Sequence, residues 1–363
     1  MPQARIYLDH AATTPILPEA RAAMIDALVR WHNPSSPHAE GRAAKAALED
    51  ARRRVKAALG WDGEVIFTSG ASEALAIAVG RTTAGRVLIS AVEHDAVLRL
   101  ATEDDRIPVD ERGHVLLQQQ VYGGTGDAGL PLSQEHKVLF AVQHANNETG
   151  IIQPIEDIAG QVRDTGGLLL CDCAQTAGKL PLPDADMIAI SAHKFGGPPG
   201  AGALLLRSFG LIAASGGQEQ GYRGGTENLP AILGMAAALE AGRDWMSRAS
   251  ALRSRLETRI VAAGAEVVGA SSPRIPTIGA YRMPGLAATT QLIQFDLAGI
   301  AVSAGSACSS GSLKPSHVLA AMGWPEAAAR EVVRVSFGPM TTEDEVDRFA
   351  DLWTQIAERR WAA

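Results

Sequence analysis

Short apolar runs alternate with longer amphipathic stretches through the first two thirds of the chain. Two amphipathic stretches, residues 18–31 and 38–59, predict helices that dock on a larger unit. The apolar runs share a length of four or five residues: 64–68, 87–90, 138–142, 168–172, 187–191 and 203–206. Because such runs, spaced by helical segments, are typical of strands buried on both faces, they predict a mostly parallel sheet.

The pattern changes after Asn228. An Ala-rich stretch over residues 231–262 predicts one or two helices that lead out of the sheet. Strand-like and helix-like segments then follow one another: residues 277–281, 290–297, 332–336 and 343–359. We therefore predict an α/β protein with a large domain over residues 15–246 and a smaller α+β domain made of residues 1–14 and 247–363.

Composition and charge indicate a globular protein and argue against nucleic-acid-binding and membrane-spanning proteins. With 363 residues, 46% of them hydrophobic and 20% charged, the chain can bury a proper core. A net charge of -7 gives no basic field for a phosphate backbone, so direct nucleic-acid binding is not expected. The first residues lack a signal peptide pattern and no apolar stretch has membrane-spanning length, so we expect a cytoplasmic location.

Three cysteines, Cys171, Cys173 and Cys308, are too few for a disulfide framework and lack the spacing of a zinc site, so no metal is expected. A G-x-G-x-x-G match at residues 124–129 is followed by Leu-Pro where a dinucleotide fold needs a helix. We interpret it as a plain turn.

Polar residues stand where the predicted strands end. Asp172 and Ser191 close two of them, and Ser69 follows a third. In an open α/β sheet, ligands bind beyond the carboxyl ends of the strands, so these residues are candidates for one site. Ser69 could cap the next helix and leave the N–H groups of Ala71 and Ser72 free for a phosphate, although an ordinary N-cap explains the same sequence.

Asp172 and Lys194 suggest a cofactor. An unpaired carboxylate at the end of an apolar strand is costly, so a cationic or hydrogen-bonding group should face Asp172, and a pyridinium nitrogen would serve. Lys194 precedes a Gly/Pro-rich turn at residues 196–200, which favours a loop position. A solvated surface lysine is the alternative.

Nine motifs occur in a fixed order along nearly the whole chain. They are YLDHAATTP (7–15), NPSS (33–36), FTSGASE (67–73), EHDAV (93–97), NNETG (146–150), DCAQTAGK (172–179), SAHK (191–194), RGGT (223–226) and SAGSACS (303–309). Together they resemble the cysteine desulfurases of the class V aminotransferase-like, fold-type I enzymes that use pyridoxal 5'-phosphate (PLP). The resemblance implies a seven-stranded, mostly parallel sheet in the large domain.

The resemblance also implies a role for each matching residue. Lys194 would hold PLP as a Schiff base and then act as general acid and base on the substrate. Asp172 would pair with the pyridine nitrogen, and His94 would stack on the ring. Gln175 and Asn147 would address the phenolic oxygen, and Asn147 would also contact the substrate.

The same resemblance implies that the PLP phosphate is bound by several residues of one chain and by one residue of a partner subunit. Its ligands would be Ala71, Ser72, Ser191, His193 and, from a second subunit, Thr226. A homodimer is therefore part of the expectation. Arg334, inside a predicted strand, would bind the substrate carboxylate in bidentate fashion, with a structural ion pair as the alternative.

Cys308 decides which PLP reaction is expected. It lies among small residues, 303–312, which suit a loop that reaches a substrate. As a thiolate it would take the sulfur of cysteine as a persulfide and leave alanine. Cys171 and Cys173 are expected to be buried, on the side of their strand opposite Asp172.

The chain departs from the family pattern in three places. Residues 74–76 are apolar where family members commonly carry asparagine, so we expect a change in packing there. The region 102–133 and the C-terminus are short, which leaves open the sulfur acceptor, such as an iron–sulfur scaffold protein. Alternative functions are a selenocysteine lyase, another class V enzyme, and a catalytically silent sulfur-relay module.

Overall fold

The computed structural model describes residues 5–30, 32–117, 137–307 and 313–361. The predicted turn at residues 124–129 and Cys308 lie outside the described residues. In the described part of the chain, no helix combines the length and apolar character needed to cross a membrane.

The larger sheet has seven strands in the order β2-β8-β7-β6-β5-β3-β4. Their bounds are β2 Glu64–Thr68, β3 Arg86–Ser90, β4 Arg106–Ile107, β5 Val138–Gln143, β6 Leu168–Asp172, β7 Met187–Ser191 and β8 Gly202–Leu206. Only β8 runs antiparallel to its neighbours among these strands. The predicted α/β architecture with a mostly parallel sheet is confirmed.

Helices cover both faces of this sheet, because alternate side chains of each strand point to opposite faces. Val65 and Phe67 of β2 join one apolar cluster, whereas Ile66 joins the other. Helices on the first face are α1 Pro18–Val29, α2 Ala39–Leu59, α6 Ile155–Asp164 and α7 Leu229–Glu240. On the second face lie α3 Ala71–Arg81 and α4 Asp95–Leu98.

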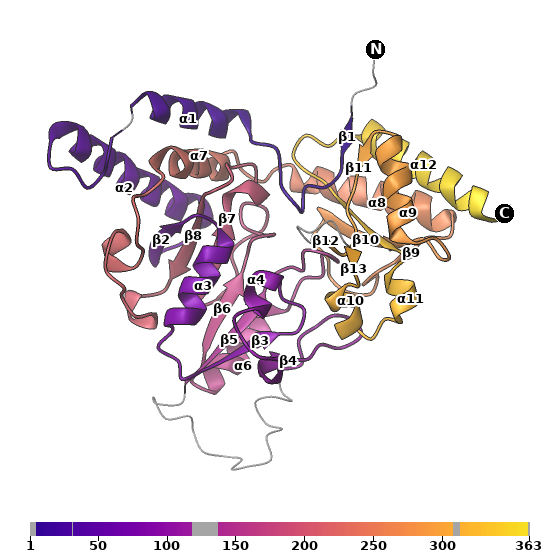
Figure 1. Ribbon diagram of the computed structural model, residues 1–363, viewed down its shortest axis with the longest axis horizontal. Coiled ribbons are helices and arrows are strands. Elements are labelled where there is room, and N and C mark those ends of the chain that lie inside the picture. The colour runs from indigo at the N-terminus through magenta and orange to yellow at the C-terminus, as the bar shows by residue number, and fades with distance from the viewer. Residues whose placement is uncertain (1–4, 31, 118–136, 308–312, 362–363) are drawn as a thin grey trace, which may run out of the picture.

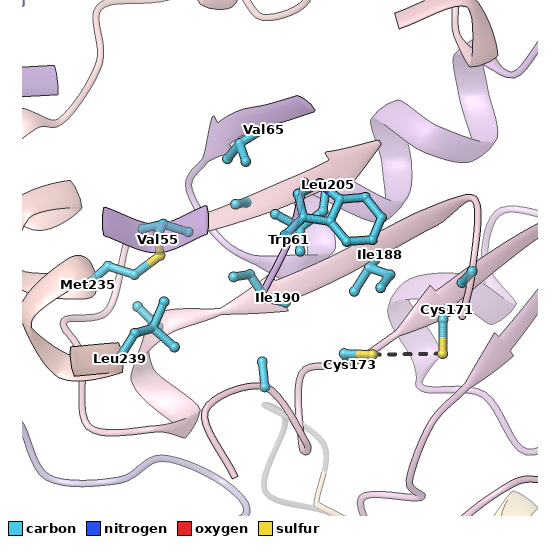
Figure 2. Close-up of a cluster of buried hydrophobic side chains, with 14 of the residues drawn as sticks. Val55, Trp61, Val65, Cys171, Cys173, Ile188, Ile190, Leu205, Met235 and Leu239 are labelled. Atoms are coloured by element: carbon cyan, nitrogen blue, oxygen red, sulfur yellow. Dashed lines mark hydrogen bonds between the residues drawn. The ribbon is translucent and has the colours of Figure 1, made fainter. Parts of the chain in front are cut away.

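Cys171 and Cys173 lie in the first of these clusters, as Figure 2 shows. Both are completely buried, and their sulfur atoms are 3.8 Å apart. The prediction that they are buried is confirmed. They pack with aliphatic side chains such as Ile188.

A second group of elements forms the right half of Figure 1. Its antiparallel sheet has the order β14 (Val332–Ser336), β10 (Ile278–Arg282), β9 (Glu266–Val267). Around it lie α8 Met246–Ala262, α9 Ala288–Leu297, α10 His317–Ala321, α11 Glu326–Ala329 and α12 Glu343–Trp361. The Ala-rich stretch is thus two helices, α7 and α8.

The N-terminal segment, residues 6–17, joins the two groups (Figure 1). Its strand β1, Ile6–Tyr7, pairs in parallel with β11, Ile300–Ala301. Ser336 donates its N–H to the carbonyl of Leu8, and further along Leu17 donates to Gly196 at 2.8 Å. A separate apolar cluster with Val92 and Val318 spans both groups. The domain boundary near residue 246 stays a prediction.

A short hairpin, β12 Ser306–Ala307 and β13 Leu313–Lys314, flanks the position of Cys308. At its start, the backbone of Ser303 exchanges two hydrogen bonds with that of Arg334 in β14. After its end, the Ser316 hydroxyl donates to the Glu148 carboxylate at 2.5 Å. The segment before the cysteine is therefore tied to β14 of the smaller sheet, and the segment after it to Glu148, which follows β5 of the larger sheet.

Candidate active site

A cavity of about 360 Å³ opens at the carboxyl ends of the central strands. Gln143, Asp172 and Ser191, the last residues of β5, β6 and β7, line it. Nine of the predicted site residues meet there: Ala71, Ser72, His94, Asn147, Asp172, Gln175, Ser191, His193 and Lys194. The expectation that polar residues at strand ends converge on one site agrees with this arrangement.

Lys194 follows β7 in a single 3-10 turn, Ala192–Lys194, and not in the predicted loop. The turn forms because Phe195 donates its N–H to the carbonyl of Ala192 at 3.1 Å before the glycines end it. The Lys194 Nζ donates to the carbonyls of Ala11 and Ala12, at 2.6 and 2.9 Å. These two acceptors belong to the backbone, so side-chain patterns could not reveal them.

Burial, followed by the charge of Arg334, lowers the pKa of Lys194 to about 8. Asp172 and Asp9 act in the opposite direction. A lysine with such a pKa carries a neutral amine in a useful fraction of molecules near neutral pH. Lys194 is therefore equipped to act as a nucleophile and as a base.

Asp172 is buried at the end of β6. Its Oδ1 accepts a hydrogen bond from the N–H of Ala174 at 2.8 Å. Burial raises its pKa, while the N–H of Ala174 and the charges of His94 and Lys194 lower it. No ion pair of Asp172 is found within the described ranges, so its carboxyl group has room for a cationic partner.

His94 precedes α4 and acts as its N-cap. Its Nδ1 accepts a hydrogen bond from the N–H of Ala96 at 3.1 Å, which fixes the orientation of the ring. Burial lowers the pKa of His94, and the nearby Asp172 partly opposes this. The imidazole therefore lines the cavity chiefly in its neutral form.

Gln175 and Asn147 line the same cavity. The Gln175 Nε2 donates to the carbonyl of Ala11 at 2.9 Å, whereas its buried Oε1 has no partner in the described structure. The carbonyl of Asn147 accepts from Arg334 Nη1 at 2.9 Å. Buried amide oxygens are rarely left without a partner, so Gln175 marks a place for a ligand.

The N-terminus of α3 forms one end of the cavity, and the prediction that Ser69 caps it is wrong. The N-cap is Gly70, and no described side chain bonds to the first turn as a cap. Ser69 lies one residue too early, and its own N–H donates to the Glu73 carboxylate at 2.5 Å. The N–H groups of Ala71 and Ser72 therefore keep the freedom that an anion site needs.

The start of α3 packs closely against strand β8. A Cβ atom on Gly202 of β8 would lie 2.6 Å from the Cα of Gly70, so only glycine fits at position 202. Ala74 and Leu75, where the family commonly carries asparagines, are buried in the apolar cluster beneath α3. This is the change in packing that the sequence predicts.

Ser191 and His193 also line the cavity, and a Cβ atom on Gly70, the N-cap of α3, would lie 3.5 Å from the Ser191 hydroxyl oxygen. The ring Nδ1 of His193 lies 3.1 Å from the Thr13 hydroxyl. Burial and the charges of Lys194 and Lys179 lower the pKa of His193 to about 4, so its imidazole is neutral at physiological pH.

Two predicted site residues lie away from the cavity lining. Thr226 is exposed and does not line the cavity of its own chain. Arg334 is buried in β14, where its Nη2 donates to Asp9 Oδ1 at 2.7 Å. The ion pair considered as an alternative is therefore present, and its partner Asp9 was not singled out by the sequence. The Arg334 Nε has no partner in the described structure.

The comparisons with known proteins identify the family. The model of the family Aminotransferase class-V matches residues 6–349, so the chain belongs to this family. Among curated proteins, the cysteine desulfurases of Cereibacter sphaeroides and Klebsiella pneumoniae are 37% and 38% identical to it. These alignments cover 98% of this chain and 96% and 93% of the two relatives.

Solved structures give the same result. A NifS-like protein from Rickettsia africae superposes with a TM-score of 0.87 at 30% identity, over 98% of this chain and 99% of that one. SspA, solved in complex with cysteine, has a TM-score of 0.76 at 28% identity, over 93% and 100% of the two chains. The predicted family and fold are confirmed.

Proposed function

We propose that this protein is a cysteine desulfurase that binds PLP, removes sulfur from L-cysteine, releases L-alanine and carries the sulfur as a persulfide on Cys308. The observation that carries this proposal is the meeting of Lys194, His94 and Asp172 in one cavity. The curated relatives that match nearly the whole chain bear this activity in their names.

The residues present suit PLP. Asp172 is a buried carboxyl group open to a cation, as a pyridinium nitrogen is, and Gln175 has an amide oxygen without a partner. The uncapped start of α3 offers the N–H groups of Ala71 and Ser72 to a phosphate. Ser191 and neutral His193 would add hydrogen bonds, and Asn147 and Gln175 would address the phenolic oxygen.

When bound, PLP supplies an electron sink for the charge that develops on the substrate α-carbon. Lys194 Nζ would hold the cofactor covalently and, once released by the substrate amine, would move the proton at the α-carbon. Its pKa of about 8 suits both tasks near neutral pH. Asp172 would keep the ring nitrogen protonated, and His94 would stack on the ring.

Cys308 would accept the sulfur. Its thiolate attacks the sulfur of cysteine, so a sulfur–sulfur bond forms as the carbon–sulfur bond breaks. The electron pair left on the β-carbon takes up a proton, and the product is alanine. Arg334 and Asn147 would bind the substrate carboxylate, with the free Nε of Arg334 available beside its pair with Asp9.

A homodimer completes this proposal, because Thr226 would reach the phosphate of the partner's site. Its exposure, away from the cavity of its own chain, supports that assignment. The sulfur would pass to an acceptor such as an iron–sulfur scaffold protein. The cytoplasmic location stays a prediction.

The test is incubation of the purified, PLP-loaded protein with L-cysteine, followed by alanine analysis and mass analysis of the Cys308 peptide. We expect alanine release and a peptide heavier by one sulfur atom. Cys308→Ala should keep the cofactor absorbance and lose sulfur transfer, while Cys171→Ala serves as the matched cysteine control. Full sulfur release by Cys308→Ala would refute the mechanism. A parallel incubation with L-selenocysteine tests the alternative: selenium release from it, with no sulfur release from L-cysteine, would favour a selenocysteine lyase.

A further inference from the structure

A loop that contains Ser215, Tyr222 and Arg223 is held against both ends of α3. Near the start of the helix, Arg223 Nε donates to Glu73 Oε1 at 2.9 Å. Near its end, Arg81 Nη1 donates to the Ser215 hydroxyl at 2.6 Å and to the Tyr222 carbonyl at 2.9 Å. The loop is therefore fixed relative to the helix that opens the candidate phosphate site.

The same loop is anchored from the sheet side and is strained. Glu219 and Gln220 have φ angles of 49° and 56°, which non-glycine residues rarely adopt. The buried Glu219 carboxylate accepts from both Nη atoms of Arg52, at 2.8 and 3.0 Å, and from the N–H of Phe67 at 2.7 Å. Strain of this kind persists only where the surroundings enforce it, so the position of Arg223 is enforced.

Glu73 presents a difficulty for anion binding. It lines the cavity beside Ala71 and Ser72, and its Oε2 accepts from the N–H of Ser69. A carboxylate in the first turn interacts favourably with the start of its helix, but it repels any phosphate bound at the same N–H groups. Arg223 is the cation that the described structure places on this carboxylate.

The charge on Glu73 is retained in the folded protein. Burial raises its pKa, but the hydrogen bonds from Ser69 and the pair with Arg223 outweigh it, and the net direction is down. The side chains of Glu73 and Arg223 are only 30% and 17% exposed, so solvent screens the carboxylate incompletely. Without Arg223, the full repulsion would act on a bound phosphate.

We propose that Arg223 is a positioning residue for the PLP phosphate: it neutralises Glu73 and thereby keeps the start of α3 attractive to a dianion. The inference rests on the proposed function, since that function supplies the phosphate. Arg223 acts through Glu73 and does not itself contact the cofactor. The proposal thus adds to the phosphate site a residue from a loop that is 150 positions away from Glu73 in the sequence.

The experiment measures PLP dissociation constants by absorbance titration of the apoenzyme. For Arg223→Gln we expect binding about tenfold weaker or more, as the uncovered charge of one partly buried carboxylate predicts. Pyridoxal, which has no phosphate, should bind with unchanged affinity. Glu73→Gln combined with Arg223→Gln should recover most of the PLP affinity, because the repelling charge is gone.

Arg81→Gln is the matched control, since it frees the same loop from the other end of α3 and leaves the Glu73 pair intact. We expect PLP affinity within about twofold of the unaltered protein. Arg223→Lys, which keeps the charge, should lose less affinity than Arg223→Gln and covers the case in which Arg223→Gln does not fold.

Equal losses in Arg81→Gln and Arg223→Gln, an equal loss for pyridoxal, or no recovery in the double variant would each overturn the inference. If unaltered protein binds PLP and Arg223→Gln binds it as tightly, only the inference fails. If unaltered protein binds no PLP, the proposed function fails and the inference with it.

Discussion

Breaking the buried pair of Arg52 and Glu219 by removing one charge should strongly destabilise the large domain. Their side chains are only 9% and 1% exposed, and Arg52 also donates to the Val65 carbonyl at 2.5 Å. The Arg52 guanidinium lies 4.7 Å from the centre of the Phe67 ring. We consider Glu219→Gln, which keeps the shape of the side chain and removes its charge.

The expected loss of stability in Glu219→Gln depends on the partners that remain for the Arg52 charge. Removing one partner of a buried pair leaves an uncompensated charge, which costs about 3–5 kcal/mol. Glu49 lies 3.1 Å from Arg52 Nε and is 44% exposed, so it compensates in part. We therefore expect a decrease of about 3 kcal/mol in the free energy of unfolding. Glu219→Leu combined with Arg52→Met should recover much of it, because no charge is then buried.

The assay is urea unfolding at fixed protein and PLP concentrations, since ligand and partner binding shift apparent stability. Asp50→Asn is the control: it breaks an exposed pair with Arg53 on the same helix, with side chains 48% and 71% exposed. This control should cost less than about 0.5 kcal/mol. A Glu219→Gln loss no larger than that of the control would refute the reasoning.

Two further predictions concern a buried lysine and a glycine. Lys179 is 3% exposed, has no ion pair in the described structure, and its pKa is lowered from 10.5 to about 7 by burial and then by Lys194. Between these values the unfolded chain binds the extra proton, so stability rises with pH through this window, and Lys179→Met should reduce that rise. Urea unfolding at neutral and alkaline pH measures it, and an unchanged pH dependence contradicts the prediction. Gly202→Ala places a Cβ 2.5 Å from the Ile190 carbonyl and 2.6 Å from Gly70, so it should cost about 2 kcal/mol or more and weaken PLP binding. Gly80→Ala, with open space around it, is the control, and equal effects of the two changes would count against this packing argument.

The apolar runs predicted the sheet well because burial on both faces leaves a direct compositional signal. The runs at 64–68, 168–172 and 187–191 coincide with β2, β6 and β7. Two-residue strands such as β4, Arg106–Ile107, went unpredicted, because two residues carry no periodicity. Nine of the residues that line the cavity were found through strand ends and motifs.

What escaped prediction is held together by contacts between distant parts of the chain. Arg52 and Glu219 are 167 positions apart, and the carbonyl of Ala11 meets Lys194 across 183 positions. A backbone carbonyl has no side-chain signature, and a long-range ion pair looks like any two surface charges in the sequence. The Ser69 cap was mispredicted because Gly70 shifts the start of α3 by one residue.

The position of the N-terminal segment has a consequence for biosynthesis. Its residues are made before their partners: Thr14 donates its N–H to the carbonyl of His193, and Ala11 donates its N–H to the Ser336 hydroxyl, both at 2.8 Å. His193 exists once about half of the 363 residues have been made, and Ser336 only after more than nine tenths of them. Such contacts between distant residues form late in folding. The segment whose carbonyls hold the reactive lysine thus reaches its full set of contacts only after Ser336 has been made, so a nascent chain cannot complete this centre before then.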